Sequence, residues 1–434
     1  MQNAQSSIKQ ELGGGLVTFM TMAYIIFVQP AVLSAAGMDF GAVTFATCIS
    51  AAIATAFMGI YANLPIAQAP GMGENFFFTY TVVLAMGVAW QEALGAVFIA
   101  GVIFLLLSIF KVRRYIVDAI PNSMKHAVAA GIGIFIAFIG LLDSGIISKS
   151  QGGVVQLGNL QSPHTLLAIF GLILIIILTV RKVPGAILWG IIATAVLALI
   201  TGMIKYEGIV SSPPSPSATF LKMSFKSILS PTGLTVIFIF LYMDMFDTVG
   251  TLLAVADAGD LLTPEGKLPR ANRALISDAV GTVVGAIFGT STVTSFIEST
   301  AGISAGARRG LSSVFVAILF LLSLFFYPLI KMIGAGITVG GATFHPITAP
   351  ALIIVGGMMT KSLNKIEWEK IWIAIPAFIT LIAIPLTYSV ADGFALGFVA
   401  YAISAIAAGK AKETNLAIWI IAALFIIRYA FISG

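Results

Sequence analysis

Charge, cysteine and histidine are all scarce in this chain of 434 residues. Only 9% of the residues are Asp, Glu, Lys or Arg, whereas a soluble domain carries about 25% charged residues. The single cysteine, Cys48, excludes an internal disulfide and a cysteine-based metal cluster. The three histidines (His126, His164 and His345) are scattered, so the sequence predicts neither a metal site nor a bound cofactor.

Apolar segments take the place of the missing charge. Hydrophobic residues make up 59% of the chain, and apolar runs of about 17 to 25 residues recur from residue 16 onward, each long enough to cross a bilayer. The N-terminus lacks the features of a cleaved signal peptide, so we expect the first span to be retained. The expected fold class is an all-α polytopic membrane protein. We predict spans at residues 16–36, 41–62, 70–88, 93–111, 124–142, 164–181, 184–203, 231–255, 272–290, 297–308, 311–334, 343–361, 369–388 and 389–408, with a further apolar segment at 415–432.

Basic residues give the chain a net charge of +5, but they fall in loops on one side of the predicted membrane. This asymmetry follows the positive-inside rule and predicts membrane topology, not a nucleic-acid surface. The loop 204–230 is the main exception, and it is long enough to translocate regardless of charge. We therefore expect a multi-pass protein of a prokaryotic cytoplasmic (inner) membrane with its N-terminus in the cytoplasm. The inner side then holds residues 111–115, Arg181, Lys182, Lys267, Arg270, Arg273, Arg308, Arg309, Lys361, Lys365, Lys370, Lys410 and Lys412.

The two halves of the chain contain matching segments on either side of the loop 204–230. The segment GLVTFMTMAYIIFVQP from Gly15 matches GLTVIFIFLYMDMFDT from Gly233, and both have a tyrosine nine residues after the glycine. A second pair is SAAIATAFMGIYANLP from Ser50 and SDAVGTVVGAIFGTST from Ser277. The order of these matches indicates a duplication. Because seven spans per half is an odd number, the second half is expected to insert inverted, as in many secondary transporters.

Two apolar regions, one in each half, contain breaks where a continuous helix is disfavoured. Residues 63–78 carry two prolines and two glycines, and residues 289–299 are rich in β-branched and hydroxyl side chains. Irregular backbone at membrane depth is tolerated only where protein or a water-filled cavity satisfies it. We predict a short strand followed by a half-helix in each region. The half-helices begin near Glu74 and Glu298, and their free N–H groups point toward the centre.

Carboxylates stand inside the predicted spans, where a charge costs about 3 kcal/mol or more. Asp244 and Asp247 share one face of the eighth span, and Thr248 extends that face. For Asp247, capping or anchoring a neighbouring helix is an equally good interpretation. Glu298 could neutralise the dipole of its own half-helix, with or without a role in substrate binding.

Other polar residues have simpler interpretations. Asp278 lies near Arg273 and is expected to form a local ion pair, and Asp143 and Asp392 lie at span ends, where they are expected to be interfacial. His345 opens the twelfth span beside a proline, where a hydrogen-bonded histidine at a helix entry is more common than a proton relay. The glycines of spans five and fourteen are expected to allow close helix packing.

A site with several carboxylates, aromatic rings and exposed backbone suits a flat heterocycle. Ring N–H groups can donate to carboxylates, ring carbonyls can accept from half-helix N–H groups, and ring faces can stack on Phe76, Phe77 and Phe296. A desolvated carboxyl group can also take up a proton near neutral pH. Glu298 is therefore expected to hold a ligand, a proton or both.

Four segments resemble one known family. MTMAYIIFVQP, QAPGMGENFFF, MDMFDTVGTL and TSFIESTAGI are similar, in this order, to the signature segments of the nucleobase–cation symporter-2 superfamily, specifically its AzgA-like purine permease branch. The resemblance runs over nearly the whole chain. It implies the uracil-permease-like fold, in which fourteen spans form a 7+7 inverted repeat and short strands break spans 3 and 10. The core (transport) domain would comprise residues 1–111 and 231–334, and the gate (scaffold) domain residues 112–230 and 335–434.

The resemblance also implies a function and a site. The function is proton-coupled uptake of a purine nucleobase (guanine, hypoxanthine or adenine) by alternating access between core and gate, and several family members are homodimers through the gate domain. Asp244 and Glu298 would be the substrate-binding carboxylates. The predicted substrate site further includes Asn75, Met72, Gly73, Phe76, Phe296, Ile297 and Thr248, and the predicted proton-coupling residues are Glu298, Asp244, Asp247 and Glu74.

The chain departs from the family pattern at two positions. Glu74 stands where the family usually has an apolar residue, commonly Leu, and Gln29 stands where it often has Asn. We expect Glu74 either to tune the pH dependence of transport or to face away from the ligand. Both purine preference and the identity of the proton carrier therefore stay open.

Three other functions remain alternatives at this point. One keeps the fold and changes the ligand to uracil, xanthine or an oxoanion, although three carboxylates disfavour an oxoanion. A second is an intramembrane aspartate-dependent enzyme, which would leave the inverted repeat without a role. A third is a channel, which saturable, proton-dependent uptake would exclude.

Overall fold

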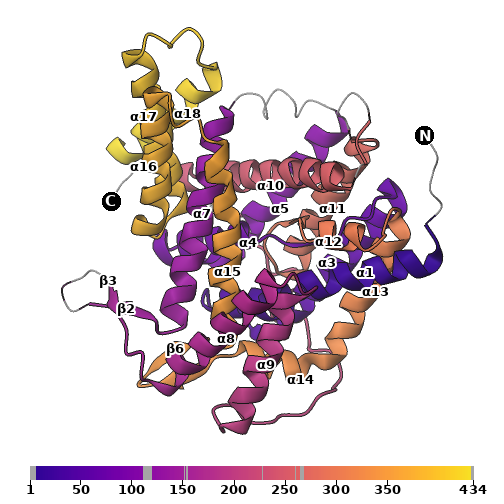
Figure 1. Ribbon diagram of the computed structural model, residues 1–434. Coiled ribbons are helices and arrows are strands. Elements are labelled where there is room, and N and C mark those ends of the chain that lie inside the picture. The colour runs from indigo at the N-terminus through magenta and orange to yellow at the C-terminus, as the bar shows by residue number, and fades with distance from the viewer. Residues whose placement is uncertain are drawn as a thin grey trace.

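The computed structural model describes residues 6–110, 120–150, 152, 155–226, 228–259, 261–263 and 268–431. The predicted inner-side basic residues 111–115 and Lys267 lie outside these ranges. The described chain is mostly helical (Figure 1). Nine of its helices are long and apolar enough to cross a membrane, and three shorter apolar helices accompany them. This confirms a polytopic helical membrane protein.

The first half runs from α1 to α9. Its elements are α1 (Ile8–Met22), α2 (Ile25–Ser34), α3 (Phe40–Phe57), η1 (Met58–Ala62), β1 (Gln68–Pro70), α4 (Met72–Phe76), η2 (Phe77–Ala85), α5 (Trp90–Ile109), α7 (Asn122–Asp143), β2 (Ile147–Lys149), β3 (Val155–Leu157), α8 (Pro163–Val180) and α9 (Ala186–Ile200).

The second half runs from α10 to α18. Its elements are α10 (Pro231–Ala258), α11 (Ala271–Phe288), β4 (Val293–Ser295), α12 (Ser299–Ser304), α13 (Gly310–Ser323), η3 (Leu324–Phe326), α14 (Tyr327–Gly334), β5 (Ile337–Val339), β6 (Ala342–Phe344), α15 (Ala349–Met359), η4 (Thr360–Lys365), α16 (Ile371–Thr387), α17 (Val390–Ala407) and α18 (Leu416–Phe431).

Element boundaries differ from the prediction in two places. The first helix begins at Ile8, not residue 16, because Ser7 forms a capping box: its side chain accepts from Gln10 N at 3.2 Å, and the Gln10 side chain accepts from Ser7 N at 2.8 Å. The predicted span 343–361 begins with strand β6, and its helix starts only at Ala349. There, β5 and β6 form a hairpin around Gly340 and Gly341, both at positive φ.

The helices pack in two groups. In one, α7 packs against α15 and α16, α16 packs against α17, and α8 packs against α9 and α15. In the other, α3 packs against α11 and α13, α1 packs against α12 and α13, and α5 packs against α10 and α11. Figure 1 shows α7, α15, α16 and α17 together on the left, and α1, α3, α11 and α13 together on the right. Each group combines helices from both halves of the chain.

Glycines allow the close helix contacts that were predicted for the fifth and fourteenth spans. A Cβ atom on Gly133 of α7 would lie 2.7 Å from Gly356 O of α15. A Cβ atom on Gly397 of α17 would collide with the side chain of Thr380 on α16. The backbones therefore approach more closely than any larger residue would permit, and this prediction is confirmed.

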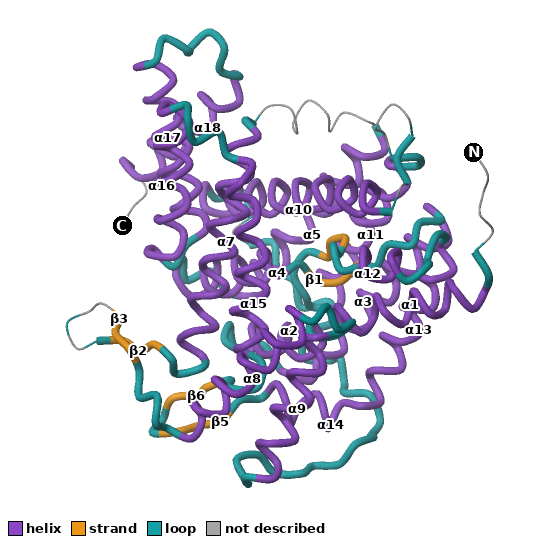
Figure 2. The backbone as a smooth tube through the Cα atoms, viewed as in Figure 1, coloured by secondary structure: helices purple, strands orange, loops and turns teal. Residues whose placement is uncertain are grey.

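Two short strands pair at the centre of the molecule (Figure 2). β1 runs antiparallel to β4, with Gln68 opposite Ser295 and Pro70 opposite Val293. The ladder continues at both ends, from Phe296 N to Ala67 O at 2.9 Å and from Gly71 N to Thr292 O at 3.0 Å. The strands lie within the two segments, 63–78 and 289–299, that were predicted to be extended. Each strand leads within a few residues into a short helix, α4 or α12.

A threonine clamps each strand in the same way. The Thr55 hydroxyl of α3 lies 2.8 Å from Gln68 N and 2.9 Å from Gln68 O. The Thr282 hydroxyl of α11 lies 3.1 Å from Val293 N and 3.1 Å from Val293 O. Thr55 and Thr282 each stand five residues after the serine that opens its matched segment. The sequence match between the halves thus corresponds to a shared contact in three dimensions.

Candidate functional site

Glu298 stands at the start of α12, directly after β4. It is half-buried, and its Oε1 accepts a hydrogen bond of 2.8 Å from the Tyr24 hydroxyl. Ile297, beside it, is 48% exposed although it lies near the centre of the fold. The N–H groups of Ser299, Thr300 and Ala301 at the start of α12 donate to backbone carbonyls of the preceding turn at 3.0–3.2 Å. The Glu298 carboxylate is therefore the group that this end of α12 offers to a ligand.

Asp247 faces the same exposed region from α10. Its side chain is exposed, and Gly250 and Leu253 continue the exposed face toward the C-terminal end of the helix. The Thr294 side chain of β4 hydrogen bonds to it. Asp247 also lies within electrostatic range of the other four acidic residues of the centre, namely Glu74, Asp244, Asp278 and Glu298. Among these five, Asp247 is the most exposed to a ligand.

Asp278 of α11 is buried behind the strand pair and accepts hydrogen bonds from three side chains. The donors are Gln68 Nε2 at 2.7 Å, Thr248 Oγ1 at 2.5 Å and Ser295 Oγ at 3.0 Å. The predicted ion pair with Arg273 is therefore wrong, because Arg273 instead donates to Tyr61 O at 3.5 Å. The carboxylate joins α10, α11 and both strands.

Asp244 is 1% exposed and lies away from the open region. Its Oδ2 accepts from Thr282 Oγ1 at 2.7 Å, and its Oδ1 has no hydrogen-bond partner among the described residues. Thr248, which was predicted to extend a substrate-binding face, is fully buried and lies 2.9 Å from the Thr294 hydroxyl. These two residues support the strands from behind in this conformation.

Glu74 bends back over the N-terminal end of its own short helix. The residue is 2% exposed, and its carboxylate lies against Gly71, where an added Cβ would also come within 2.8 Å of Thr294 Cγ2. A negative charge at this position is stabilised by the free N–H groups of α4. The carboxylate is therefore close both to β4 and to the start of its own helix.

Asn75 and Gln29 meet the second half beside the strand pair. Asn75 Oδ1 accepts from the Ser291 hydroxyl, while Asn75 Nδ2 is buried and unpartnered in the described residues. Gln29 Nε2 donates to Thr290 Oγ1 at 2.7 Å, and Gln29 Oε1 is likewise unpartnered. Buried amide atoms of this kind usually find a partner, so the region can accept further hydrogen bonds.

The remaining predicted contact residues are buried in packing contacts. Met72 and Phe296 are 7% and 5% exposed. Gly73 faces α7, where an added Cβ would lie 3.1 Å from Ile132 Cγ2. Phe76 packs at a ring distance of 5.4 Å on Tyr80, and Phe77 packs edge-on against Phe240. A ligand would have to displace these contacts to stack on either ring.

Sequence reasoning missed three residues that the fold brings into the centre. Tyr24 was noted only as part of the repeat, Asp278 was assigned to an ion pair with Arg273, and Thr282 was not singled out. Only the matched spacing of Thr55 and Thr282 within the repeat could have indicated a shared role.

Comparison with known proteins places the chain among permeases. A family model described as Permease family (Xan_ur_permease) matches residues 9–396. A putative permease of Methanocaldococcus jannaschii is 51% identical over 99% of this chain and 96% of its own length. The guanine/hypoxanthine permease PbuG of Bacillus subtilis is 44% identical over 99% of this chain and 98% of its own length. The adenine permease AdeQ of Escherichia coli is 40% identical over 98% of this chain and 93% of its own length.

Solved structures show the same fold at low identity. The transmembrane domain of the cyanobacterial bicarbonate transporter BicA aligns with a TM-score of 0.60 and 16% identity, covering 94% of this chain and 98% of that one. Identity this low supports the fold alone, whereas the sequence matches extend along the whole chain. The chain therefore belongs to the nucleobase–cation symporter-2 family of permeases, and it is a transporter, not an enzyme.

Proposed function

We propose that this protein takes up a purine nucleobase (guanine, hypoxanthine or adenine) together with protons. The observation that carries the proposal is the open region at the centre, where exposed Asp247 and half-buried Glu298 lie within electrostatic range of each other. Relatives at 44% and 40% identity are named as guanine/hypoxanthine and adenine permeases. Their names support guanine, hypoxanthine or adenine over uracil or xanthine as the ligand.

Exposed Asp247 and half-buried Glu298 suit the donors of a purine. The ring N–H and exocyclic amine groups can donate to the carboxylates of Asp247 and Glu298. Asp244 was also predicted to bind substrate. Its buried contact with Thr282 favours a role in proton coupling in this conformation.

Proton coupling follows from the crowding of acidic groups. Asp247 lies within electrostatic range of four other carboxyl groups, so the centre holds five in all. Carboxylates this close in a low-dielectric site cannot all be ionised, so some share or hold protons. A bound base that donates to two of them changes where those protons reside.

Alternating access would move one helix group past the other. The group with α1, α3, α5, α10, α11 and α13 corresponds to the proposed core domain, residues 1–111 and 231–334. The group with α7, α8, α9, α15, α16 and α17 corresponds to the proposed gate domain, residues 112–230 and 335–434. We further propose the seven-plus-seven inverted arrangement of fourteen spans, with β1 and β4 breaking spans 3 and 10. The clamps by Thr55 and Thr282 support it.

The orientation proposed from charge puts the exposed centre on the cytoplasmic side. Arg270 and Arg273 contact the C-terminal end of the α3–η1 helix, and Arg308 and Arg309 follow α12. The exposed face of α10 runs from Asp247 toward its C-terminal end, on the side of these arginines. We propose an inner-membrane location with a cytoplasmic N-terminus, and a homodimer through the gate domain stays a prediction.

Uptake of radiolabelled hypoxanthine in cells that lack their own purine permeases tests the proposal. Asp247→Asn and Glu298→Gln should each abolish concentrative uptake, because each removes an acceptor for a ring N–H group, while the amount of protein in the membrane stays unchanged. Asp257→Asn is the matched control, since Asp257 is exposed near the C-terminal end of the same helix and should be tolerated.

A panel of unlabelled bases identifies the ligand. Guanine, hypoxanthine or adenine should compete with the labelled base, whereas uracil and xanthine should not. Competition by uracil or xanthine alone would replace the assignment of guanine, hypoxanthine or adenine. Parental uptake by either neutralised variant would contradict the central site as proposed.

A further inference from the structure

A second cavity lies at the opposite end of the molecule from the arginines. It has a volume of about 370 Å³ and is lined by the end of α2, the start of α3, η2, the end of α7 and the entry to α15. α3 starts in this cavity at Phe40, and the helix that continues it ends at Ala62, whose carbonyl accepts from Arg270. In the proposed orientation, the cavity therefore faces the outside.

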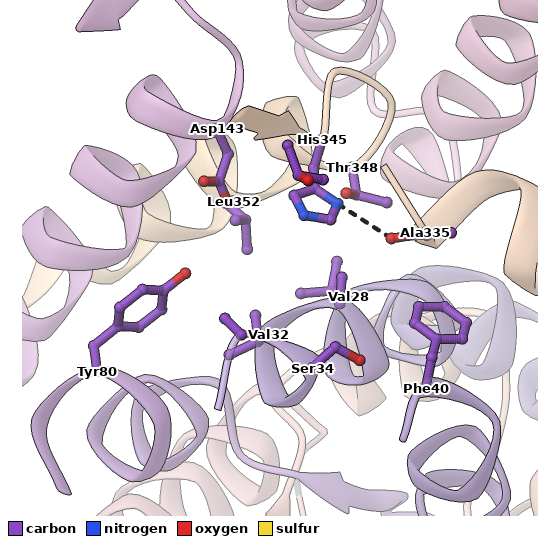
Figure 3. A pocket seen from close by; sticks show the side chains of 14 residues that line it. Val28, Val32, Ser34, Phe40, Tyr80, Asp143, Ala335, His345, Thr348 and Leu352 are labelled. Carbon is purple, nitrogen blue, oxygen red and sulfur yellow. Dashed lines mark hydrogen bonds between the residues drawn. The ribbon is translucent and has the colours of Figure 1, made fainter. Parts of the chain in front are cut away.

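Polar groups of the cavity wall lack protein partners. Within the described residues, neither the Asp143 carboxylate nor the Tyr80 hydroxyl makes a protein hydrogen bond, and Ser34 Oγ is buried and unpartnered. Figure 3 shows Asp143, Tyr80, Ser34 and His345 around one space. An unsatisfied buried polar group costs about 1–3 kcal/mol, so the Ser34 hydroxyl requires water or a ligand. The Asp143 and Tyr80 side chains are partly exposed and can bind the same molecule.

His345 is held at the wall by its backbone and its ring. Its N–H donates to Asp143 O at 2.9 Å, and its Nδ1 lies 3.1 Å from Gly334 O (Figure 3). This matches the predicted hydrogen-bonded histidine at a helix entry. Because Nδ1–H donates to the carbonyl, Nε2 remains an acceptor. The wall thus offers a carboxylate, a hydroxyl donor, an acceptor nitrogen and two aromatic rings.

We propose that this cavity is an outer binding subsite for a planar nitrogen heterocycle, which occupies it before reaching the central site. The proposal rests on the proposed function. Asp143 accepts from ring N–H groups, Tyr80 and Ser34 donate to ring nitrogens or carbonyls, and the rings of Tyr80 and His345 offer flat surfaces. The volume lies at the lower end of the range of about 300–1,000 Å³ for small-molecule sites.

An aromatic cluster separates the outer cavity from the centre. Tyr80 packs against Phe76 at a ring distance of 5.4 Å and against Phe135 at 6.0 Å, and Phe135 meets Tyr388 at 5.9 Å. Phe76 and Tyr80 come from the proposed core, whereas Phe135 and Tyr388 come from the proposed gate. Movement of the core helices past the gate helices would separate these rings. A base in the outer subsite would therefore lie next to the aromatic contact that must open before the base reaches the centre.

Cysteine protection tests the subsite without relying on transport. Cys48 is buried, so Cys48→Ala gives a background in which Ala35→Cys places one thiol at the exposed rim of the cavity. A membrane-impermeant maleimide is applied to intact cells with and without hypoxanthine. Protection should persist when Glu298→Gln disables the central site. Asp143→Asn should raise the hypoxanthine concentration for half-protection at least tenfold.

Lys222→Cys is the matched control, because Lys222 is exposed on the loop 204–230 of the same predicted side and is absent from the cavity wall. It should be labelled with or without hypoxanthine, which also checks orientation and membrane insertion of each variant. Loss of Ala35→Cys protection in Glu298→Gln, or no protection at all, would overturn the subsite. Parental uptake by Glu298→Gln would instead contradict the central site, so the two failures are distinguishable.

Discussion

Thr55 and Thr282 hold the two central strands by the same contact, although they come from different halves of the chain. Each hydroxyl lies within 3.1 Å of both the N and the O atom of one strand residue. Strands of three residues leave backbone groups unpaired on their outer edges, and buried backbone groups need partners. The duplication therefore supplied the same support to β1 and β4.

Unlike the two threonines, most acidic residues of the centre have no acidic counterpart at the matched position of the other half. Only the acidic residue after each strand recurs, as Glu74 and Glu298. The two halves thus share a backbone scaffold, while the second half adds most of the acidic chemistry. Around its strand the second half has Asp244, Asp247 and Asp278, whereas the matched positions of the first half hold Ile26, Gln29 and Ala51.

The largest expected effect comes from making the halves alike at Asp278. Asp278→Ala introduces the residue that the first half has at position 51 and removes the acceptor for Gln68, Thr248 and Ser295. Each buried donor left unpaired costs about 1–3 kcal/mol. The free energy of unfolding of a whole domain is only about 5–15 kcal/mol. We expect little folded protein, measured as monodisperse yield and thermal unfolding in detergent. Asp278→Asn keeps one acceptor oxygen and should be intermediate. An unfolding temperature like the parent's for Asp278→Ala would contradict the network.

A smaller difference should separate the two threonines. Thr55→Val and Thr282→Val both remove a strand clamp, at roughly 1–3 kcal/mol for the lost hydrogen bonds. Thr282→Val should lower the unfolding temperature more, because it also leaves buried Asp244 without its single hydrogen bond among the described residues. Serine at either position restores the hydroxyl and should recover most of the loss. Equal losses for the two valine variants would show that Asp244 is not energetically coupled to Thr282.

Asp244→Asn should alter coupling more than binding. The Thr282 hydroxyl has one hydrogen, which it can donate to an ionised Asp244 or to Val293 O. A protonated Asp244 can instead donate to Thr282, so the proton content of Asp244 decides which bond β4 receives. We expect hypoxanthine binding within about tenfold of the parent, roughly 1.4 kcal/mol, with loss of concentrative uptake and its pH dependence. The charges of Asp247, Asp278 and Glu74 also affect the protonation of Asp244. The pH profile of uptake is therefore measured for a neutralised variant of each of these residues as well. A parental profile for Asp244→Asn would exclude this relay.

The smallest effect is expected at Glu74, the acidic position that both halves share. Glu74→Leu removes a carboxylate that lies against Gly71 at the start of its own helix. Hypoxanthine affinity should stay within about tenfold, roughly 1.4 kcal/mol. The pH optimum of uptake should shift, because one fewer carboxyl group acts on Asp247 and Asp278. Glu74→Gln is the control, because it removes the charge of the side chain but keeps its shape. Complete loss of binding would make Glu74 a primary ligand residue instead.

Several features followed from local sequence alone. Long apolar runs predicted helices in every region where the structure has them, because spanning a bilayer demands length and apolarity from each segment separately. Proline, glycine and β-branched clusters predicted that residues 63–78 and 289–299 would not be continuous helices. The glycines that allow close packing could also be found from their pattern.

The environment of each acidic residue depended on contacts across the two halves. Asp278 seemed close to Arg273 along the chain, but the fold turns it toward Gln68, which is 210 residues away. Asp244 and Asp247 are three residues apart on one helix, yet one is buried and the other exposed. The sequence determined which segments cross the membrane and where they break, because those properties depend on local composition. Only the tertiary structure decided which carboxylate is exposed at the centre and which supports a strand, because burial and hydrogen-bond partners come from segments distant in the chain.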